Sequence, residues 1–434
     1  MRSKAALGLG MLAVGWPSAA HAQWQTTTVG GVDVRIYAPA ATSPAGEGRA
    51  LMIILHGCSQ TADQIKTHGN LEAAADAMGV VMAVPNVPFG GVVAGCWDYY
   101  GSLHSRSGGH NGPIVAMTEA MRDDAAYGID AAQMYIVGFS SGGGQALILG
   151  CVAPDLYAGV GAVAAPGLGS TINEIGNPTT TGDATADLCR SYAAGNVADL
   201  ATQTAIVFND ANDFTVAQGY GLINTEMFAN TIAGGIGAMG TESLDMGMLP
   251  GASPMGTATV YSDADGDRLV RLESTGISHN WPAGSGASAG GLTFVSGPGL
   301  NFSQYAAEFF AANNVRADGW TPGGDDDGGD DAPDDGGDGG DTGDDGDDGE
   351  PSGDEAGSDD DGADGASSAD DAGDGGDGGP GGGGVQPQDP DYIEPTGCQC
   401  AADRDRGGLG WSVLLLALGV GLRRRRTAAR SQRG

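Results

Sequence analysis

Positively charged residues are scarce in this sequence. Its 434 residues include 19 Lys and Arg against 55 Asp and Glu, which gives a formal net charge of −36. Between Gln23 and Pro322 there are nine basic residues, dispersed along the chain and outnumbered by 26 acidic ones. Binding to nucleic acid requires clustered Lys and Arg that neutralise phosphates, so nucleic acid is excluded as an expected partner.

Apolar residues are nearly missing from one long stretch. Residues 323–384 contain 24 glycines and 24 acidic residues among 62, with no Lys or Arg. Such a stretch buries too little apolar surface to offset the entropy of ordering it, so we predict a disordered Asp/Gly-rich linker over residues 323–397. Repulsion between its charges keeps such a linker extended. Calcium binding is the less favoured alternative, because the aspartates lack the regular spacing of a calcium loop.

The first 22 residues have the parts of a secretory signal peptide. Arg2 and Lys4 precede an apolar run from Ala5 to Trp16, and Ala20-His21-Ala22 is a small-x-small cleavage site. The apolar run is too short to span a bilayer. We therefore predict that residues 1–22 direct secretion and that residues 23–322 form the folded domain, outside the cell.

Cysteines are also few, six in all. In the oxidising environment that secretion implies, Cys58, Cys96, Cys151 and Cys189 are predicted to form two disulfides. Four cysteines allow three pairings. We favour 58 with 96 and 151 with 189, although the sequence alone does not decide between the pairings.

Residues 398–434 combine three features in order: Cys398-Gln399-Cys400, an apolar run from Leu409 to Leu422, and four arginines, Arg423–Arg426. The run is shorter than the 20 or so residues of a lone spanning helix, and the positive charge behind it predicts a cytoplasmic C-terminus. This order resembles the C-terminal sorting tail of myxobacterial surface proteins. The resemblance implies that sorting machinery anchors Cys398 or Cys400 and removes the segment behind the anchored cysteine, so that the membrane is contacted only through this tail. The alternative is a retained tail anchor, or two cysteines without a special role.

Between residues 50 and 312, apolar strand patterns alternate with helical ones. Continuous apolar runs predict strands buried on both faces, and apolar residues at helical spacing predict the helices. The predicted strands are 50–55, 80–84, 134–137, 160–164 and 204–208, and the predicted helices are 62–78, 113–127, 141–151 and 302–312. This alternation predicts an α/β fold with a mostly parallel central sheet and helices on both faces.

Five residues rich in aspartate, Asp263–Asp267, separate two further strand patterns at 257–262 and 268–274. The acidic loop suggests a metal site, but it lacks the spacing of a calcium loop. It also stands where a hairpin needs turn residues, so we predict a turn and no metal there.

The motif Gly138-Phe139-Ser140-Ser141-Gly142 follows a predicted strand and precedes a predicted helix. In this context G-x-S-x-G is typical of a strained turn that presents a serine hydroxyl, and its small residues let helix and strand approach closely. Ser140 is therefore the predicted nucleophile. An oxyanion formed during acyl transfer needs two donors, for which we predict the backbone N–H groups of Ser141 and of Cys58 in an early strand-end loop.

The other members of a catalytic triad follow the serine in the order acid, then histidine. Of the six histidines, five precede Ser140, so His279 is the predicted general base. The loop after the strand at 204–208 offers two carboxylates, Asp210 and Asp213. General triad logic does not separate them.

These residues match a known family at four motifs: Leu55-His56-Gly57-Cys58-Ser59-Gln60-Thr61, Cys96-Trp97, Ile129-Asp130 followed by Tyr135–Gly143, and His279-Asn280-Trp281-Pro282. Over about Val32 to Ala312 the chain resembles the secreted polyhydroxybutyrate (PHB) depolymerase-type esterases, which include feruloyl and acetylxylan esterases. The resemblance implies an α/β-hydrolase fold, a Ser-His-Asp triad and hydrolysis of carboxylic esters without a cofactor or metal.

Carried over by position, the resemblance implies that Ser140 is the nucleophile, His279 the general base and acid, and Asp213 the orienting carboxylate. The family commonly has His-Gly where this chain has Asn209-Asp210, so Asp210 stays the alternative. Trp97 and Trp281 lie beside matched motifs and are expected to form an aromatic wall for the substrate, with ordinary packing as the alternative.

The expected function is that of a secreted, surface-tethered serine esterase of the PHB depolymerase type. A feruloyl or acetylxylan esterase acting on plant polysaccharide is the alternative. The absence of a recognisable polymer-binding domain after Pro322 argues mildly against efficient attack on crystalline polyester. An inactive binding protein with a hydrolase fold and a peptidase are the remaining alternatives.

Overall fold

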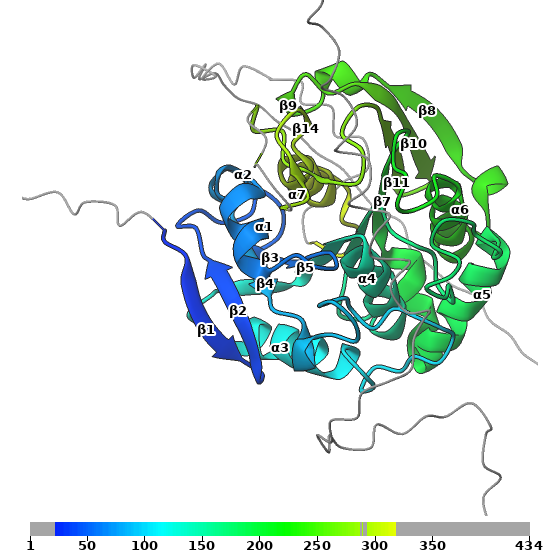
Figure 1. Cartoon of the computed structure of the whole chain (residues 1–434). Coiled ribbons are helices and arrows are strands. Elements are labelled where there is room, and N and C mark those ends of the chain that lie inside the picture. The colour runs from blue at the N-terminus through cyan, green and yellow to red at the C-terminus, as the bar shows by residue number, and fades with distance from the viewer. Residues whose placement is uncertain (1–21, 287–288, 290–292, 318–434) are drawn as a thin grey trace, which may run out of the picture. The chain divides into compact units, whose positions relative to one another are not determined.

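A ten-stranded sheet runs through the folded part of the chain. The structure is a computed structural model, and it describes residues 22–286, 289 and 293–317. The strand order is β1-β2-β4-β3-β5-β6-β7-β11-β10-β8 (Figure 1). Except for Ala22, the predicted signal peptide lies outside the described residues, as do the predicted linker and C-terminal tail. No helix within the described residues has the length and apolar character to cross a membrane.

Six neighbouring strands in the middle of the sheet are parallel. They are β4 (Val80–Pro85), β3 (Arg49–Leu55), β5 (Ile129–Phe139), β6 (Gly159–Val163), β7 (Thr204–Asp210) and β11 (Gly266–Ser274). Antiparallel strands continue the sheet on both sides: β1 (Gln25–Val29) and β2 (Val32–Tyr37) next to β4, and β10 (Gly256–Asp263) and β8 (Gly240–Leu244) next to β11.

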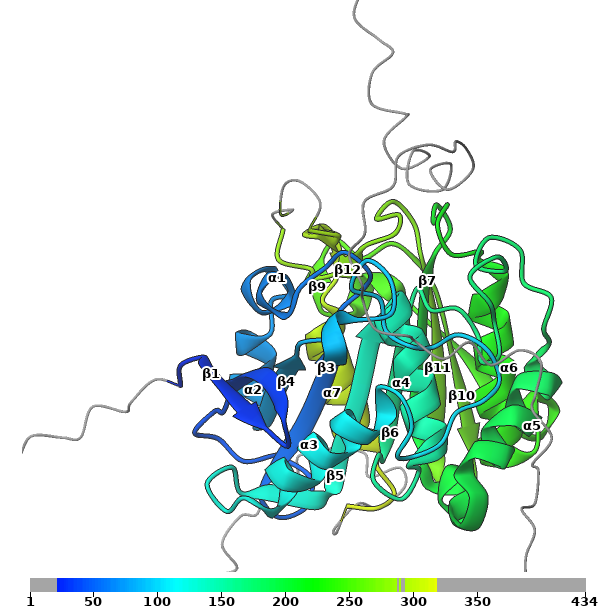
Figure 2. The same cartoon turned by 60° about the horizontal axis from the view of Figure 1, so that its bottom comes forward.

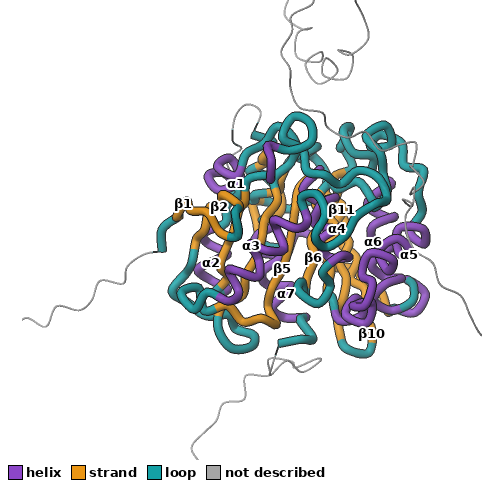
Figure 3. The backbone as a smooth tube through the Cα atoms, turned by 90° about the horizontal axis from the view of Figure 1, so that it is seen from below, coloured by secondary structure: helices purple, strands orange, loops and turns teal. Residues whose placement is uncertain are grey.

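Helices cover both faces of this sheet (Figures 2 and 3). One apolar cluster joins the sheet to α3 (Asn111–Asp123), α4 (Ser141–Val152), α5 (Gly182–Ala193) and α6 (Gly219–Ala233). A second cluster joins the opposite face to α1 (Ala62–His68), α2 (Glu72–Met78) and α7 (Phe302–Asn313). Alternate β3 residues belong to different clusters, Leu51 and Ile53 to the first and Met52 and Ile54 to the second. Burial on both faces explains the continuous apolar runs, and the predicted α/β-hydrolase fold is confirmed.

The remaining elements are short and join or flank these layers. They are the 3-10 helices η1 (Pro88–Gly90), η2 (Ala194–Thr202), η3 (Ile236–Ala238) and η4 (Met246–Met248), and the strands β9 (Gly251–Ala252), β12 (Trp281–Pro282), β13 (Val295–Ser296) and β14 (Gly299–Leu300).

The helix predicted over 62–78 is in fact two helices. A capping box at Thr61 and Gln64 starts α1, which ends at His68, and α2 begins only at Glu72. Between them Asn70 has a φ of 57°, in the left-handed region that helices of L-residues do not use. The single-helix prediction was therefore wrong at this turn.

The acidic segment at 263–267 forms the predicted hairpin turn. Asp263 pairs with Gly266 across the β10–β11 hairpin, and its Oδ1 accepts the Asp265 backbone N–H at 2.8 Å. Its other oxygen, Oδ2, accepts a hydrogen bond from the buried Arg268 guanidinium at 3.0 Å. Arg268 thus supplies the positive charge beside these aspartates, where the sequence had suggested a metal ion.

Both predicted disulfides are present. Cys58 is bonded to Cys96, and Cys151 to Cys189. The first bond joins the loop after β3 to the loop that follows η1, and the second joins α4 to α5.

Three buried or half-buried histidines make stability depend on pH. Desolvation lowers the pKa of His56, His104 and His110 below the ordinary value of 6.5. A hydrogen bond also requires His110 to be neutral, because its Nδ1 accepts the Asp98 backbone N–H at 2.9 Å and must be unprotonated to do so. In the unfolded chain these imidazoles bind protons near pH 6.5, whereas in the folded chain they stay neutral to lower pH.

We therefore expect the free energy of unfolding to be highest above pH 6.5 and to fall as the pH drops below it. The slope is at most about 1.4 kcal/mol per pH unit for each of these histidines. Urea unfolding between pH 7.5 and 5 measures it. The variant His110→Asn keeps an acceptor for Asp98 but does not titrate, so it should have a shallower slope. An unchanged slope would contradict the assignment to His110.

Candidate active site

Ser140 lies in the sharp turn between β5 and α4. Its backbone has φ 56° and ψ −120°, a combination that non-glycine residues rarely adopt and that costs about 1–3 kcal/mol. The turn is held by a hydrogen bond from the Ser140 N–H to the Val163 carbonyl oxygen at 2.8 Å. The sequence thus places this serine at the carboxyl edge of the sheet in a strained conformation that the packing around it maintains.

Two positions of the motif must be glycine, because neighbouring backbone atoms lie too close for a side chain. A Cβ at Gly142 would lie 2.4 Å from the carbonyl oxygens of Leu55 and His56, and one at Gly138 would lie 2.1 Å from the Gly142 carbonyl oxygen. Any side chain at either position would push the start of α4 away from the ends of β3 and β5. The glycines therefore allow the serine turn to sit directly on the sheet.

The structure brings three of the predicted site residues into one hydrogen-bonded chain. His279 Nε2 lies 3.0 Å from Ser140 Oγ, and His279 Nδ1 lies 2.8 Å from Asp213 Oδ2. Asp213 is buried, and its Oδ1 accepts the backbone N–H groups of Thr215 and Val216 at 2.8 and 3.0 Å. A carboxylate fixed in this way holds the proton on Nδ1 and leaves Nε2 free to accept the hydroxyl proton.

Asp210, the alternative acid, makes different contacts. Its Oδ2 accepts hydrogen bonds from Ser274 Oγ at 2.7 Å and from the Ile277 backbone N–H at 3.0 Å. Its Oδ1 accepts the Asn212 N–H at 2.8 Å. The side chain therefore anchors the loop that carries His279 to the end of β7, and it is Asp213 that faces the imidazole.

Further contacts hold the histidine loop, and these the sequence analysis missed. Asp210 and Ser274 are neighbours across the parallel strands β7 and β11, so the loops that follow them leave the same edge of the sheet. Ser278 Oγ donates to the Asn212 carbonyl oxygen at 3.0 Å, and the Phe139 ring lies 4.8 Å from the His279 ring between centroids. These contacts follow from the pairing of β7 with β11, and the sequence does not reveal that pairing.

The two predicted oxyanion donors belong to the serine turn and to the loop that lies against it. Ser141 is the first residue of α4, so its N–H has no acceptor within the helix. Cys58 lies in the loop after β3, which is held by its disulfide and by the Ser59 N–H donating to the Ala94 carbonyl oxygen at 2.8 Å. Within the part of the chain that the structure describes, neither donor N–H has an acceptor. At Gly57, a Cβ would lie 3.3 Å from Ser140 Cβ, so this loop lies against the serine.

Trp97 and Trp281 do not form the expected aromatic wall. Both side chains are 0% exposed. The Trp97 indole N–H donates to the His56 carbonyl oxygen at 2.8 Å, and that of Trp281 to the Gly69 carbonyl oxygen at 3.4 Å. The packing alternative therefore holds, because burying a large ring with its N–H bonded stabilises the interior. Trp97 supports the loop that carries Cys58.

Among residues 22–286, 289 and 293–317, no group of three or more His, Cys, Asp or Glu side chains is placed to hold a metal ion.

Comparison with known proteins identifies a related esterase family over part of the chain. Residues 34–230 match the family model described as Esterase PHB depolymerase. The matched range contains Ser140 and Asp213 and ends before His279. Over residues 34–230 the chain is therefore similar to this esterase family.

Several curated relatives of this chain act on esters according to their names. A poly(3-hydroxybutyrate) depolymerase from Ralstonia pickettii is 33% identical over 307 residues, which cover 68% of this chain and 61% of that protein. Feruloyl esterase B from Neurospora crassa is 31% identical over 119 residues, 27% of this chain and 37% of that protein. Acetylxylan esterase A from Aspergillus ficuum is 26% identical over 132 residues, 30% of this chain and 40% of that protein. The chain thus spans less than two thirds of each relative.

Among solved structures, an acetyl xylan esterase from Aspergillus awamori is similar with a TM-score of 0.45 and 18% identity. The similarity covers 59% of this chain and 94% of that one.

Proposed function

We propose that this chain is a serine hydrolase of carboxylic esters that acts through an acyl-enzyme. The observation that carries the proposal is the continuous hydrogen-bonded chain from Ser140 Oγ through His279 to the buried Asp213. The distances of 3.0 and 2.8 Å are within the range for proton transfer between a nucleophile and its base.

In the first half-reaction, Ser140 Oγ attacks the ester carbonyl carbon while its proton passes to His279 Nε2. The negative charge on the former carbonyl oxygen is stabilised by the backbone N–H groups of Cys58 and Ser141, and the charged imidazole is stabilised by Asp213. The bond between the carbonyl carbon and the alcohol oxygen then breaks, and His279 gives its proton to the leaving alcohol.

In the second half-reaction, water attacks the acyl-enzyme. His279 Nε2 takes a proton from the water as it adds to the carbonyl carbon, and the same backbone donors stabilise the second oxyanion. The bond to Ser140 Oγ breaks, His279 returns the proton to the serine, and the carboxylic acid leaves. Each cycle thus consumes one ester bond and one water, and restores all three side chains.

Two substrate classes are compatible with this chemistry. The depolymerase from Ralstonia pickettii covers more of this chain than the feruloyl and acetylxylan esterases do, which puts a short-chain polyhydroxyalkanoate first. Feruloyl or acetyl esters on plant polysaccharide are the second class.

We further propose that the enzyme acts outside the cell. Residues 1–22 serve as the signal peptide, residues 23–322 form the catalytic domain, and residues 323–397 act as a spacer. The tail at 398–434 tethers the protein to the cell surface through sorting machinery. The disulfides Cys58–Cys96 and Cys151–Cys189 support an oxidising location. Polymers that cannot enter a cell are suitable substrates for an enzyme placed there.

The proposed function is tested with the purified full chain on amorphous polyhydroxybutyrate and on methyl ferulate. We expect release of hydroxybutyrate or ferulate, and stoichiometric labelling by a fluorophosphonate probe that peptide mass spectrometry places on Ser140. Hydroxybutyrate release assigns the polyester class, and ferulate release alone assigns plant-wall esters. If neither product forms and the probe does not label Ser140, the esterase proposal is wrong.

A further inference from the structure

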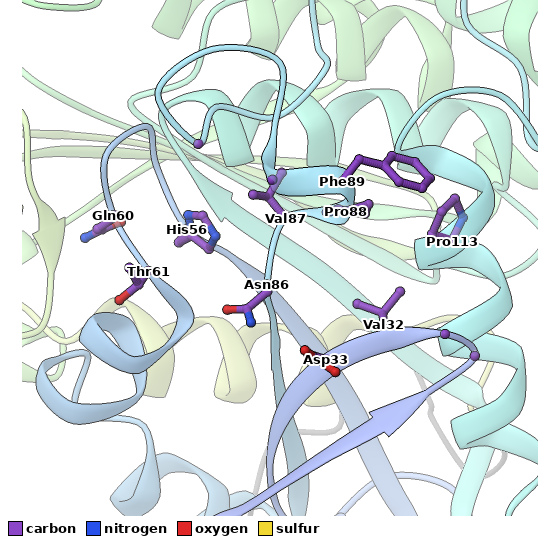
Figure 4. Close-up of a pocket in the computed structure, with 14 residues that line it drawn as sticks. Val32, Asp33, His56, Gln60, Thr61, Asn86, Val87, Pro88, Phe89 and Pro113 are labelled. Carbon is purple, nitrogen blue, oxygen red and sulfur yellow. The ribbon is translucent and has the colours of Figure 1, made fainter. Parts of the chain in front are cut away.

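A cavity of about 650 Å³ lies beside the loop that carries Cys58 (Figure 4). None of the three residues of the hydrogen-bonded chain, Ser140, His279 and Asp213, lines it. Its walls come from the turn between β1 and β2, from the loop after β4, from the loop after β3, and from the start of α3. The proposed function leaves this cavity without a role.

The cavity and the oxyanion donors share one loop. His56 and Gln60 line the cavity on either side of Gly57 and Cys58 in the sequence. Gln60 fixes this loop, because its Oε1 accepts the Gly57 N–H at 2.8 Å and its Nε2 donates to the Thr293 carbonyl oxygen at 2.6 Å. A ligand in the cavity therefore contacts the loop that also lies against Ser140.

Three of the side chains that line the cavity offer uncommitted hydrogen-bond acceptors. Asp33 uses Oδ1 for the Thr28 hydroxyl at 2.7 Å, and no hydrogen bond within the described residues uses its Oδ2. The Nδ1 of His56 lies 2.9 Å from the Gly57 carbonyl oxygen, which requires the proton on Nδ1 and makes Nε2 an acceptor. In the described part of the chain, the Asn86 side-chain amide has no hydrogen-bond partner, and it brings both an acceptor and donors. Figure 4 shows Asn86 and Asp33 between Thr61 and Val32.

The lining carries no Lys or Arg, and Asp33 is its one charged residue. A carboxylate, sulfate or phosphate group in the cavity would therefore face the negative charge of Asp33. Arg35, the cation whose charge interacts with Asp33, does not line the cavity and is hydrogen-bonded to Asp63. A neutral ligand that donates several hydrogen bonds would fit these acceptors instead.

Phe89 provides an exposed aromatic surface at this cavity. Its side chain is 84% exposed, and its φ of 57° is strained for a bulky residue. The ring lies 6.1 Å from that of His110 between centroids, and Pro88 and Pro113 add apolar lining. A strained backbone at a residue whose ring is mostly in water indicates that the ring has a ligand to contact rather than a core to fill.

We propose that this cavity binds a sugar residue of a neutral polysaccharide. The Phe89 ring stacks on the C–H face of the sugar, while Asp33, Asn86 and His56 Nε2 accept hydrogen bonds from its hydroxyl groups. A polyester chain is a poor match, because its ester oxygens only accept hydrogen bonds and would face the Asp33 carboxylate and the His56 lone pair. The inference rests on the proposed function in one respect: it favours the second of the two ester classes, esters carried on polysaccharide.

The test measures binding without turnover. In the full chain carrying Ser140→Ala, xylotetraose and a linear hydroxybutyrate tetramer are titrated by calorimetry and by saturation-transfer NMR. We expect the tetrasaccharide to bind and the hydroxybutyrate tetramer not to bind. Adding Phe89→Ala or Asn86→Ala should weaken sugar binding about ten-fold each, and Asp33→Asn should weaken it several-fold.

Met248→Ala is the matched control. Met248 is apolar and 81% exposed, comparable to Phe89, but it lies in η4, which contacts β10 near the other end of the sheet. This variant should bind the sugar as tightly as its parent. Thermal unfolding of each variant verifies that all are folded.

Three results would overturn the inference: no binding of the tetrasaccharide at millimolar concentration, equal weakening by Phe89→Ala and Met248→Ala, or Phe89-dependent binding of the hydroxybutyrate tetramer instead. Because the Ser140→Ala chain performs no chemistry, this outcome is independent of the proposed function. Sugar binding together with an inactive wild type would contradict only the esterase, and ester release without sugar binding would contradict only the inference.

Discussion

Replacing Ser140 with alanine is expected to lower kcat for ester hydrolysis by about 10⁴ to 10⁶-fold, with little change in KM. The variant loses the hydroxyl oxygen that His279 Nε2 contacts at 3.0 Å, so no acyl-enzyme forms. Alanine keeps a Cβ, so the strain of the turn at φ 56° is unchanged and the fold is preserved. The initial rate on p-nitrophenyl acetate over a range of concentrations measures both constants.

The matched control for this variant is Ser191→Ala. Ser191 is an exposed serine on α5 whose Oγ donates only to the Leu188 carbonyl oxygen of the same helix. Its replacement should leave kcat and the fluorophosphonate labelling of Ser140 as in the wild type. If Ser140→Ala kept more than a small fraction of the rate, another nucleophile would have to exist and the proposed mechanism would be wrong.

The order of chemical groups along the chain made part of this site predictable. A G-x-S-x-G motif between an apolar strand and a helix identifies the turn that holds Ser140, and His279 is the only histidine behind it. The parallel strands were predictable for a related reason. Because both faces of the sheet are covered, β3 and β4 are apolar without interruption, a pattern that amphipathic surface strands do not have.

The structural features that the sequence did not predict depend on contacts between residues that lie far apart in the chain. The break between α1 and α2 is stabilised by Asn70 Nδ2, which donates to the Ala283 carbonyl oxygen at 2.9 Å, 213 residues further along the chain. The Gly69 carbonyl oxygen accepts from both the Trp281 indole and the Ser303 hydroxyl at 3.4 Å. The helical spacing of apolar residues over 62–78 does not identify these partners. The same contacts explain why Trp281 is an interior residue.

General triad logic did not choose between Asp210 and Asp213, and only the family resemblance favoured Asp213. Both follow the strand predicted at 204–208 by a few residues, and either carboxylate satisfies the general requirement for an acid near the histidine. The outcome depends on the register of β7 with β11, which sets Ser274 opposite Asp210. Once Asp210 is held by Ser274 and by the Ile277 N–H, Asp213 is the carboxylate left to face His279.

This division of roles leads to opposite expectations for the two isosteric variants. In Asp213→Asn, the amide oxygen still accepts the Thr215 and Val216 N–H groups, while the amide N–H₂ faces His279 Nδ1. The imidazole is then forced to carry its proton on Nε2 and cannot take the proton of Ser140. We expect kcat to fall about 10⁴-fold. Since the backbone contacts survive, the free energy of unfolding should change by less than about 1 kcal/mol.

In Asp210→Asn, one of the two buried carboxylate oxygens becomes an N–H₂ group that faces a donor, whether Ser274 Oγ, the Ile277 N–H or the Asn212 N–H. We expect the free energy of unfolding to fall by about 1–3 kcal/mol, while kcat at 15 °C, where the variant is folded, stays within about ten-fold of the wild type. Urea unfolding and initial rates on one ester, measured in parallel, separate the two variants. The reverse result, a stable but inactive Asp210→Asn and an active Asp213→Asn, would make Asp210 the triad acid. It would also mean that the 2.8 Å contact between His279 and Asp213 is not the one used in catalysis.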